Sequence, residues 1–277
     1  MQLGAIFLDQ AVFNVELPQA DAEVIPGVPW GAIEAFPTPA YWAYQVYARR
    51  LTGNRINYKL GATLKEEVGA CLLGGHGIPA NVGLAAFHHV KERGAFGDEP
   101  PTEEMLLEWL REPLDVEGRS VRYRFAKQKA RYLCAALQKL CAEGPPLSTG
   151  KALRNWLLDI PGIGYKTASW VARNWLDADD VAILDIHILR AGLLGKFFES
   201  NLTVERHYLE LEEQFIRFSK GLGVRASELD ALMWLEMMSS PATVHSIMGI
   251  GHHAPESGSR RSPKKSKADP SQLALIG

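Results

Sequence analysis

The stretch that decides the fold reads Leu-Leu-Asp-Ile-Pro-Gly-Ile-Gly-Tyr-Lys-Thr-Ala-Ser-Trp-Val-Ala and occupies residues 157–172. Helical periodicity leads up to Ile160, where Pro161 and the glycines that follow interrupt it. A second helix is expected to begin near Tyr165. Its buried stripe would consist of Ala168, Val171, Ala172 and Trp175. Residues 150–175 are therefore predicted to form a helix-hairpin-helix, two helices joined by a tight turn.

The turn of this hairpin suits the binding of an anion. Gly162 and Gly164 would let the backbone around Ile163 approach a phosphate closely, because they carry no side chain. The helix that follows points unpaired N–H groups and the positive end of its dipole at the same place. Such a contact holds a nucleic-acid backbone without reading its sequence. The alternative is that the two glycines only interrupt a helix, as they do in many loops.

A carboxylate stands at a second predicted helix start further along the chain. Residues 181–190 read Val-Ala-Ile-Leu-Asp-Ile-His-Ile-Leu-Arg, so an apolar run leads directly to Asp185. An aspartate in this position would ordinarily serve only as an N-cap. With Lys166 on the second hairpin helix, the capping role and a catalytic role can coincide in Asp185.

The formal net charge of -2 hides a sharp segregation of charge along the chain. Residues 98–117 hold eight acids, whereas residues 119–139 hold seven basic residues and no acid. In the second of these segments, a helix over 126–141 would place Lys127 and Lys129 off its apolar stripe, on a basic exterior. This exterior could bind phosphates despite the neutral average. A merely solvated helix face is the alternative.

Composition divides the chain into three parts. Residues 1–60 are rich in proline and aromatic residues and are expected to pack on the core as a collar, with a helix beginning after Pro39. Residues 61–244 form the predicted helical domain, in which Ser227 and Asp230 have the spacing of a capping box for a late helix. Residues 245–277 are basic and too poor in apolar residues to order themselves. This tail could attract phosphates or only increase solubility.

Several classes of protein are excluded by the bulk numbers. The 47% of hydrophobic residues suffices for a packed core. No apolar run reaches the roughly 18 residues of a membrane span, and the N-terminus lacks the basic flank of a signal peptide, so a cytoplasmic protein is expected. The three cysteines, Cys71, Cys134 and Cys141, are too scattered for a disulfide framework and are expected in the core.

The hairpin and residues 181–190 together resemble the helix-hairpin-helix GPD superfamily, specifically its 8-oxoguanine DNA glycosylase branch. Residues 123–133 (Tyr-Arg-Phe-Ala-Lys-Gln-Lys-Ala-Arg-Tyr-Leu) are similar to a helix of the compact, mainly archaeal enzymes, and residues 228–234 resemble their last helix. The resemblance spans roughly residues 64–240. It implies a mainly α, two-lobed glycosylase fold. No cysteine follows Cys141, so the four-cysteine loop of the iron–sulfur relatives is missing and no cluster is expected.

The resemblance also implies a reaction and a partner. The uncharged amine of Lys166 would attack C1′ of a damaged nucleotide, expel the base and form a Schiff base that proceeds to strand cleavage by β-elimination. Asp185 would stabilise the oxocarbenium-like sugar and help to deprotonate the amine. The partner would be duplex DNA containing a damaged or modified base, bound by a monomeric, nucleoid-associated enzyme that needs no cofactor and no metal.

Three further residues receive roles from the resemblance. Trp234 would stack on the extruded base, with a place in the hydrophobic core as the alternative. His187 would touch a backbone phosphate, with an ordinary position on a helix face as the alternative. His76 lies in the loop 74–79, where relatives carry a wedge, although the sequence of this loop is unlike theirs.

The chain departs from the compact enzymes in two places. Ile186 stands where they have a positively charged residue after the catalytic aspartate, and the chain continues past Ser239 into the tail. The identity of the base therefore stays open between 8-oxoguanine and another altered base, such as a hypermodified one. A noncatalytic DNA-binding module is the alternative from another class, since helix-hairpin-helix elements also occur in proteins that only hold DNA.

Overall fold

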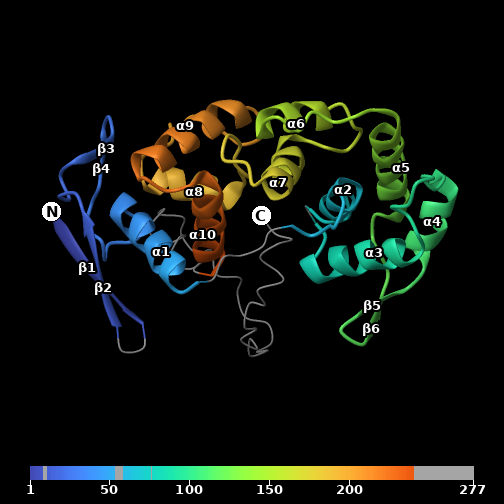
Figure 1. Cartoon of the computed structure of the whole chain (residues 1–277), viewed down its shortest axis with the longest axis horizontal. Coiled ribbons are helices and arrows are strands. Elements are labelled where there is room, and N and C mark those ends of the chain that lie inside the picture. Colours follow the sequence, from blue (N-terminus) through green and yellow to red (C-terminus); the bar gives the residue numbers. More distant parts are fainter. Residues whose placement is uncertain (9–10, 54–58, 76, 240–277) are drawn as a thin grey trace, which may run out of the picture.

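A computed structural model describes residues 1–8, 11–53, 59–75 and 77–239 of the chain, and this part is mainly helical (Figure 1). The helices are α1 (Pro39–Leu51), α2 (Leu64–Leu73), α3 (Ala80–Glu92), α4 (Glu103–Arg111), α5 (Ala126–Ala142), α6 (Gly150–Leu157), α7 (Tyr165–Leu176), α8 (Ile186–Leu194), α9 (Tyr208–Gly221) and α10 (Ala226–Ser239). The strands are β1 (Gln2–Leu8), β2 (Ala11–Leu17), β3 (Glu23–Ile25), β4 (Val28–Pro29), β5 (Leu114–Val116) and β6 (Arg119–Val121). They pair in sequence order as antiparallel, two-stranded ladders.

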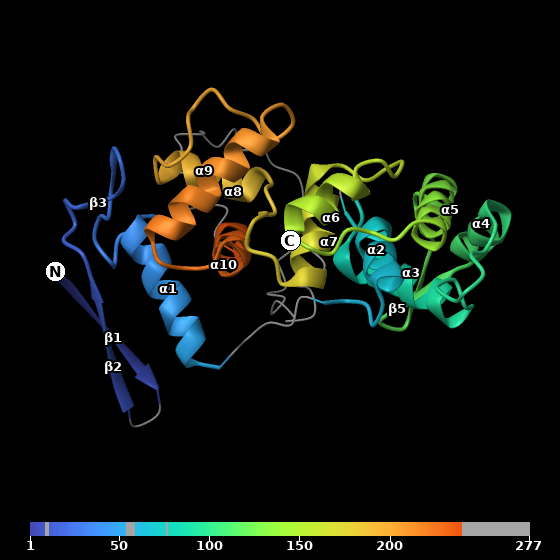
Figure 2. The same cartoon turned by 45° about the horizontal axis from the view of Figure 1, so that its top comes forward.

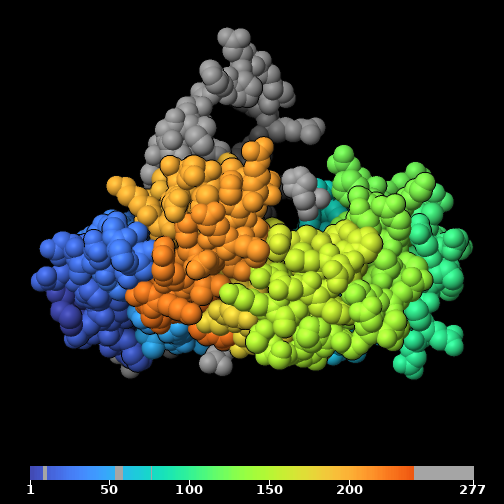
Figure 3. Space-filling model, turned by 90° about the horizontal axis from the view of Figure 1, so that it is seen from above, coloured from blue at the N-terminus to red at the C-terminus, as the bar shows by residue number. Residues whose placement is uncertain are grey.

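The helices fall into two lobes, and the predicted fold class is confirmed. One lobe holds α1 and α8–α10, and the other holds α2–α5, with α6 and α7 between them (Figures 1 and 2). The buried apolar residues of α7 belong to a core to which α2, α5 and α6 also contribute. Seen from above, the surface of α9 adjoins that of α6, so the hairpin meets both lobes (Figure 3).

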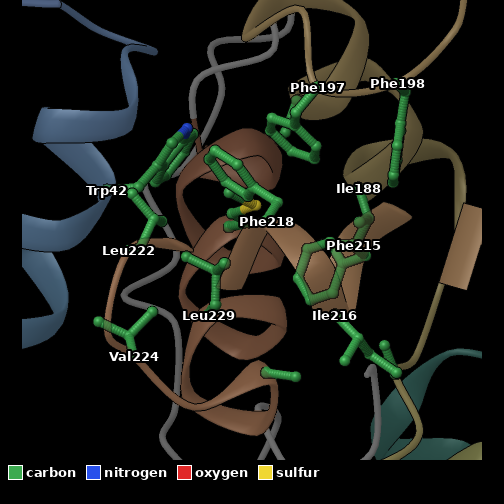
Figure 4. Packing of buried hydrophobic residues seen from close by; sticks show 14 of the residues in the cluster. Trp42, Ile188, Phe197, Phe198, Phe215, Ile216, Phe218, Leu222, Val224 and Leu229 are labelled. Carbon is green, nitrogen blue, oxygen red and sulfur yellow. The ribbon is translucent and has the colours of Figure 1, made fainter. Parts of the chain in front are cut away.

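The first lobe is built around aromatic side chains. Phe197, Phe215 and Phe218 pack together, and the rings of Phe197 and Phe218 stack with centroids 3.8 Å apart (Figure 4). Trp42 of α1 belongs to the same buried cluster. Burial of such large apolar side chains is the main stabilising contribution available to this lobe.

The N-terminal residues contain the predicted helix and, in addition, strands that the sequence analysis did not predict. Helix α1 begins at Pro39, as expected, and Thr38 caps it by accepting a hydrogen bond from the N–H of Tyr41. It packs against α10. The unexpected element is the β1–β2 hairpin, where Gly4 makes room for the ring of Tyr44. The proline-based interpretation missed it because the strands precede the proline-rich stretch.

Three local predictions are corrected by the structure. The first helix of the hairpin ends at Leu157, three residues before the predicted end at Ile160. Helix α10 begins at Ala226, and the proposed capping box is wrong, because the Asp230 carboxylate binds Arg173 and the N–H of Ile183 instead. Cys71 and Cys134 are buried as expected, but Cys141 is exposed.

Helix α7 is more buried than a surface helix would be. Ala168, Val171 and Ala172 are buried as predicted, whereas Trp175 is only partly buried. Ser169, Trp170, Arg173 and Asn174 are buried as well. The helix therefore lies in the centre of the molecule, because both lobes pack around it, and a single apolar stripe does not describe it.

No helix in the described ranges is long and apolar enough to cross a membrane.

Candidate active site

The hairpin turn presents the start of α7 without a side-chain cap. Gly164 is the N-cap residue, and no described side chain bonds to the first N–H groups of the helix there. The turn is closed by backbone bonds, among them one from the N–H of Ile163 to the carbonyl of Ile160 at 3.1 Å. The N–H groups at this helix start can therefore donate hydrogen bonds to an anion from solution, and the positive end of the helix dipole attracts it.

The two glycines of the turn differ in their surroundings. Gly162 has a φ of +85°, and a Cβ added to it would lie 2.1 Å from the ring of Tyr132 on α5. Gly164 has a φ of -98°, and a Cβ added there would meet nothing within 4 Å. Gly162 is therefore required by the fold, while Gly164 leaves open space in front of the helix end.

Lys166 and Asp185 come together at the starts of two helices. The Nζ of Lys166, in the first turn of α7, lies 3.4 Å from Oδ2 of Asp185, the N-cap of α8. The other oxygen, Oδ1, accepts the N–H groups of His187 at 2.8 Å and Ile188 at 3.2 Å. One carboxylate thus caps a helix and faces the lysine amine at the same time, as the sequence suggested.

The two side chains of this pair differ in their exposure to solvent. The side chain of Lys166 is 41% exposed, whereas that of Asp185 is 13% exposed. An amine that solvent can reach, next to a shielded carboxylate fixed by two backbone N–H groups, matches the arrangement of a nucleophile and a group that accepts its proton.

His187 and Trp234 lie beside this pair. Burial lowers the pKa of His187 below its ordinary value; Asp185 opposes this shift, while Arg190 and Lys166 add to it. The imidazole of His187 and the ring of Trp234 lie nearly perpendicular to each other, with a centroid distance of 6.2 Å and an interplanar angle of 81°. Trp234 is 4% exposed and belongs to the core of the first lobe.

The remaining predicted site residues are distributed over α5 and the loop after α2. Lys127 is exposed on α5. Lys129 is only partly exposed, which corrects its predicted place on the basic exterior: its ammonium donates to the carbonyls of Leu72 and Gly74 at the end of α2. Burial lowers the pKa of Lys129. His76 lies outside the described residues.

A buried set of polar residues behind the pair was missed by the sequence analysis. Arg154 pairs with Glu212, and Arg173 pairs with Asp230, all four being buried. Tyr208 is buried beside them. A usable signal was present, because Glu212 follows Tyr208 by one helical turn and so falls on the buried face of α9. In the described ranges, no group of three or more His, Cys, Asp or Glu residues could hold a metal ion.

Comparison with known families and proteins gives consistent matches. A model of the family described as 8-oxoguanine DNA glycosylase matches residues 63–224. Curated proteins named 8-oxoguanine DNA glycosylase/AP lyase are similar to the chain: that of Methanocaldococcus jannaschii is 33% identical over 134 residues, covering 45% of this chain and 62% of its own length. The protein of Saccharolobus islandicus is 34% identical over 126 residues, covering 42% and 60%. The chain therefore matches about six tenths of the length of these relatives.

A solved structure shares the fold. The crystal structure of the Methanocaldococcus jannaschii 8-oxoguanine DNA glycosylase aligns with a TM-score of 0.53 at 24% sequence identity. The alignment covers 72% of this chain and 93% of the solved chain. The helical fold is thus common to both proteins. The family match covers residues 63–224, whereas the motifs predicted a resemblance over residues 64–240, so the match ends 16 residues earlier than expected.

Proposed function

The chain belongs to the 8-oxoguanine DNA glycosylase family, and from this membership we propose that it is a base-excision DNA glycosylase with an associated AP-lyase activity. Its substrate is duplex DNA containing 8-oxoguanine or a related modified base. The observation that carries the proposal is the 3.4 Å approach of Lys166 Nζ to Asp185 Oδ2. A module that only binds DNA needs neither the amine nor a carboxylate held against it.

The proposed reaction begins with transfer of a proton from the Lys166 ammonium towards Asp185. The free amine attacks C1′ of the damaged nucleotide, a C1′–N bond to lysine forms, and the bond to the base breaks with its electron pair leaving on the base. The Asp185 carboxylate stabilises the positive charge that develops on the sugar. Opening of the sugar ring gives a Schiff base, and loss of a proton from C2′ expels the 3′ phosphate. Hydrolysis then frees the lysine.

DNA binding is assigned to the hairpin and to α5. The uncapped start of α7, around Gly162, Ile163 and Gly164, would hold a backbone phosphate, and exposed Lys127 would add a second phosphate contact. His187, on the first turn of α8, would contact a phosphate next to the extruded nucleotide. Trp234 keeps the role that the resemblance implies, which is to stack on the base once the nucleotide has left the duplex.

A different base remains a second candidate because of one observation. Ile186 is 49% exposed directly after Asp185, where the resemblance leads one to expect a positive charge. An apolar side chain at this position favours a base or a neighbouring group that needs no cation there. The chemistry at C1′ is the same for either substrate.

Borohydride trapping tests the proposal. Duplexes that contain 8-oxoguanine, uracil or an abasic site are incubated with the protein and sodium borohydride, which reduces a Schiff base to a stable covalent adduct. We expect an adduct with the wild type, none with Lys166→Gln, and an unchanged adduct with Lys220→Gln, a matched change of an exposed lysine on α9. Asp185→Asn should slow base release by about 10²–10⁴-fold.

The outcomes separate the candidates. An adduct with the 8-oxoguanine duplex shows that the protein excises 8-oxoguanine. An adduct with only the abasic duplex shows that the protein has lyase activity and excises a base other than the two tested. No adduct with any duplex, together with retained DNA binding, would show a noncatalytic module. An adduct that survives Lys166→Gln would contradict the assignment of the nucleophile.

A further inference from the structure

The segment that leads to Asp185 has an unusual support. Residues 181–185 are neither helix nor strand in the described structure, and yet they are almost entirely buried. Three successive backbone N–H groups in this segment donate to side chains. That of Ala182 donates to Glu212 at 3.0 Å, that of Ile183 to Asp230 at 3.1 Å, and that of Leu184 to the hydroxyl of Tyr208 at 3.2 Å. Each buried N–H group therefore has its partner without a neighbouring strand.

The same side chains reach back to the hairpin. Arg154 of α6 pairs with Glu212 of α9, and Arg173 of α7 pairs with Asp230 of α10. Each carboxylate thus uses one oxygen for the segment and the other for an arginine of the hairpin. The two helices that present Lys166 and the segment that presents Asp185 are consequently held by the same two acids.

Tyr208 makes a third connection. Its hydroxyl donates to the carbonyl of Ala182 at 2.8 Å while it accepts the N–H of Leu184. Its ring stacks on that of Tyr165, with centroids 5.3 Å apart and an interplanar angle of 17°. Tyr165 immediately precedes Lys166, and Leu184 immediately precedes Asp185, so one side chain contacts the neighbours of both partners.

Stability alone does not explain these contacts. Burial raises the pKa of Asp230 to about 6, although Arg173 and the N–H of Ile183 act in the opposite direction. Charges in such an environment cost desolvation energy, and buried ion pairs are often no more stabilising than apolar side chains of similar volume. What these acids do provide is a fixed place for the segment, because the N–H groups of Ala182 and Ile183 donate to carboxylates, and hydrogen bonds to charged acceptors are shorter and stronger than neutral ones.

We propose that Glu212, Asp230 and Tyr208 are positioning residues for Asp185: they hold the segment before it in register with the hairpin, and so set the approach of its carboxylate to the Lys166 amine. The proposal rests on the function proposed above. It assigns no direct contact with the substrate to any of the three residues.

Tyr208→Phe is the sharpest test, since it removes one hydroxyl and keeps the ring. The matched control is Tyr44→Phe, which removes the hydroxyl that donates to the carbonyl of Ala5 in the N-terminal hairpin. Both variants are compared with the wild type in single-turnover excision and in binding to a duplex with an uncleavable abasic analogue, at a temperature where all three are folded. Hydrogen exchange of the Leu184 N–H is followed in parallel.

We expect Tyr208→Phe to lower the excision rate by about 10- to 100-fold, because a displacement near 1 Å at the reacting groups has an effect of this size. Its affinity for the duplex should stay within about threefold, since the lost hydroxyl bonds to Ala182 and Leu184 in the segment before Asp185. The Leu184 N–H should exchange faster. Tyr44→Phe should change none of these quantities.

The proposal is overturned if Tyr208→Phe excises the base at the wild-type rate, or if excision and DNA affinity fall together. Should Tyr208→Phe fail to fold, Glu212→Gln takes its place, since it keeps an acceptor for the N–H of Ala182 while removing the charge that faces Arg154. A wild type that gives no adduct with any duplex overturns the proposed function itself. An active wild type with an equally active Tyr208→Phe overturns only the positioning role.

Discussion

Two connections of the chain present the proposed catalytic pair, and they are held in opposite ways. The turn before Lys166 is closed by backbone bonds to near neighbours, such as those from Ile160 to Leu157 and from Ile163 to Ile160. The segment before Asp185 is held by side chains 24, 30 and 47 residues away in sequence. The lysine is therefore placed by local structure, whereas the aspartate is placed by tertiary structure.

The largest expected effect concerns the segment. Asp230→Ala removes the carboxylate that binds both Arg173 and the N–H of Ile183, in a completely buried place. Breaking a buried ion pair on one side costs about 3–5 kcal/mol, which urea unfolding would measure. The control is Asp177→Asn, which removes the charge of a surface ion pair with Arg225, the Asp177 side chain being 78% exposed, and keeps a residue that tolerates the left-handed backbone of this position. Loss of this surface pair should cost at most about 1 kcal/mol. Equal losses for the two variants would contradict the comparison.

The turn has its own sensitive position at Gly162. An alanine there must adopt a positive φ, which costs about 1–2 kcal/mol, and its Cβ would collide with the ring of Tyr132. Overpacking adds about 1–3 kcal/mol. A double-mutant cycle with Tyr132→Ala separates the two contributions, since truncating the ring relieves the collision and leaves the backbone strain. Additive losses would show that the ring and the turn are independent.

Gly164 should behave differently from Gly162, although the two belong to one motif. Gly164→Ala needs no unusual backbone angle and meets no neighbour, so its free energy of unfolding should stay within about 0.5 kcal/mol of the wild type. If a phosphate approaches the start of α7, the added methyl group should weaken DNA binding by about tenfold, which corresponds to one charged hydrogen bond. Fluorescence anisotropy with a labelled duplex measures this. Unchanged affinity would place the phosphate elsewhere.

The same contrast explains what could be predicted from the sequence. The hairpin, the start of α7 and the capping position of Asp185 follow from glycine, proline and periodicity within a few residues. The support of the segment does not, since helical spacing can place Glu212 on a buried face of α9 but cannot tell that Glu212 and Asp230 meet residues 181–185 there. The local interpretation even assigned Asp230 to a capping box, because a carboxylate three residues after a serine has that spacing whether or not tertiary structure uses it elsewhere.

Lys127 and Lys129 show a similar limit. Both were placed on a basic exterior, yet only Lys127 is exposed. Their positions differ by two residues, or about 200° around a helix, so one of them had to turn inward once α2 packed on α5. The carbonyls at the end of α2 then became the partners of the Lys129 ammonium. A helix C-terminus is a favourable place for a cation, but the sequence does not show which basic side chain will lie at the end of α2, because this depends on how α2 and α5 pack.

The smallest expected effect is the contribution of His187 to the pH dependence of stability. His187 lies next to the end of the segment, where its N–H donates to the Asp185 carboxylate. The pKa of His187 is lowered in the folded protein, chiefly by burial, so the unfolded chain binds a proton more readily than the folded one. Stability should therefore fall as the pH drops below the ordinary histidine pKa of about 6.5, and this contribution vanishes above it, where His187 is neutral in both states.

Urea unfolding between about pH 5 and pH 7.5 measures this contribution. The free energy of unfolding should decline less steeply towards low pH for His187→Asn than for the wild type. His88→Asn, a change of an exposed histidine on α3, should leave the decline unaltered. Equal slopes for the wild type and His187→Asn would mean that the pKa of His187 is the same in the folded and unfolded states. Solvent, or the charge of Asp185, would then offset the burial of the imidazole, and the site at the end of the segment would be more open than the burial of residues 181–184 indicates.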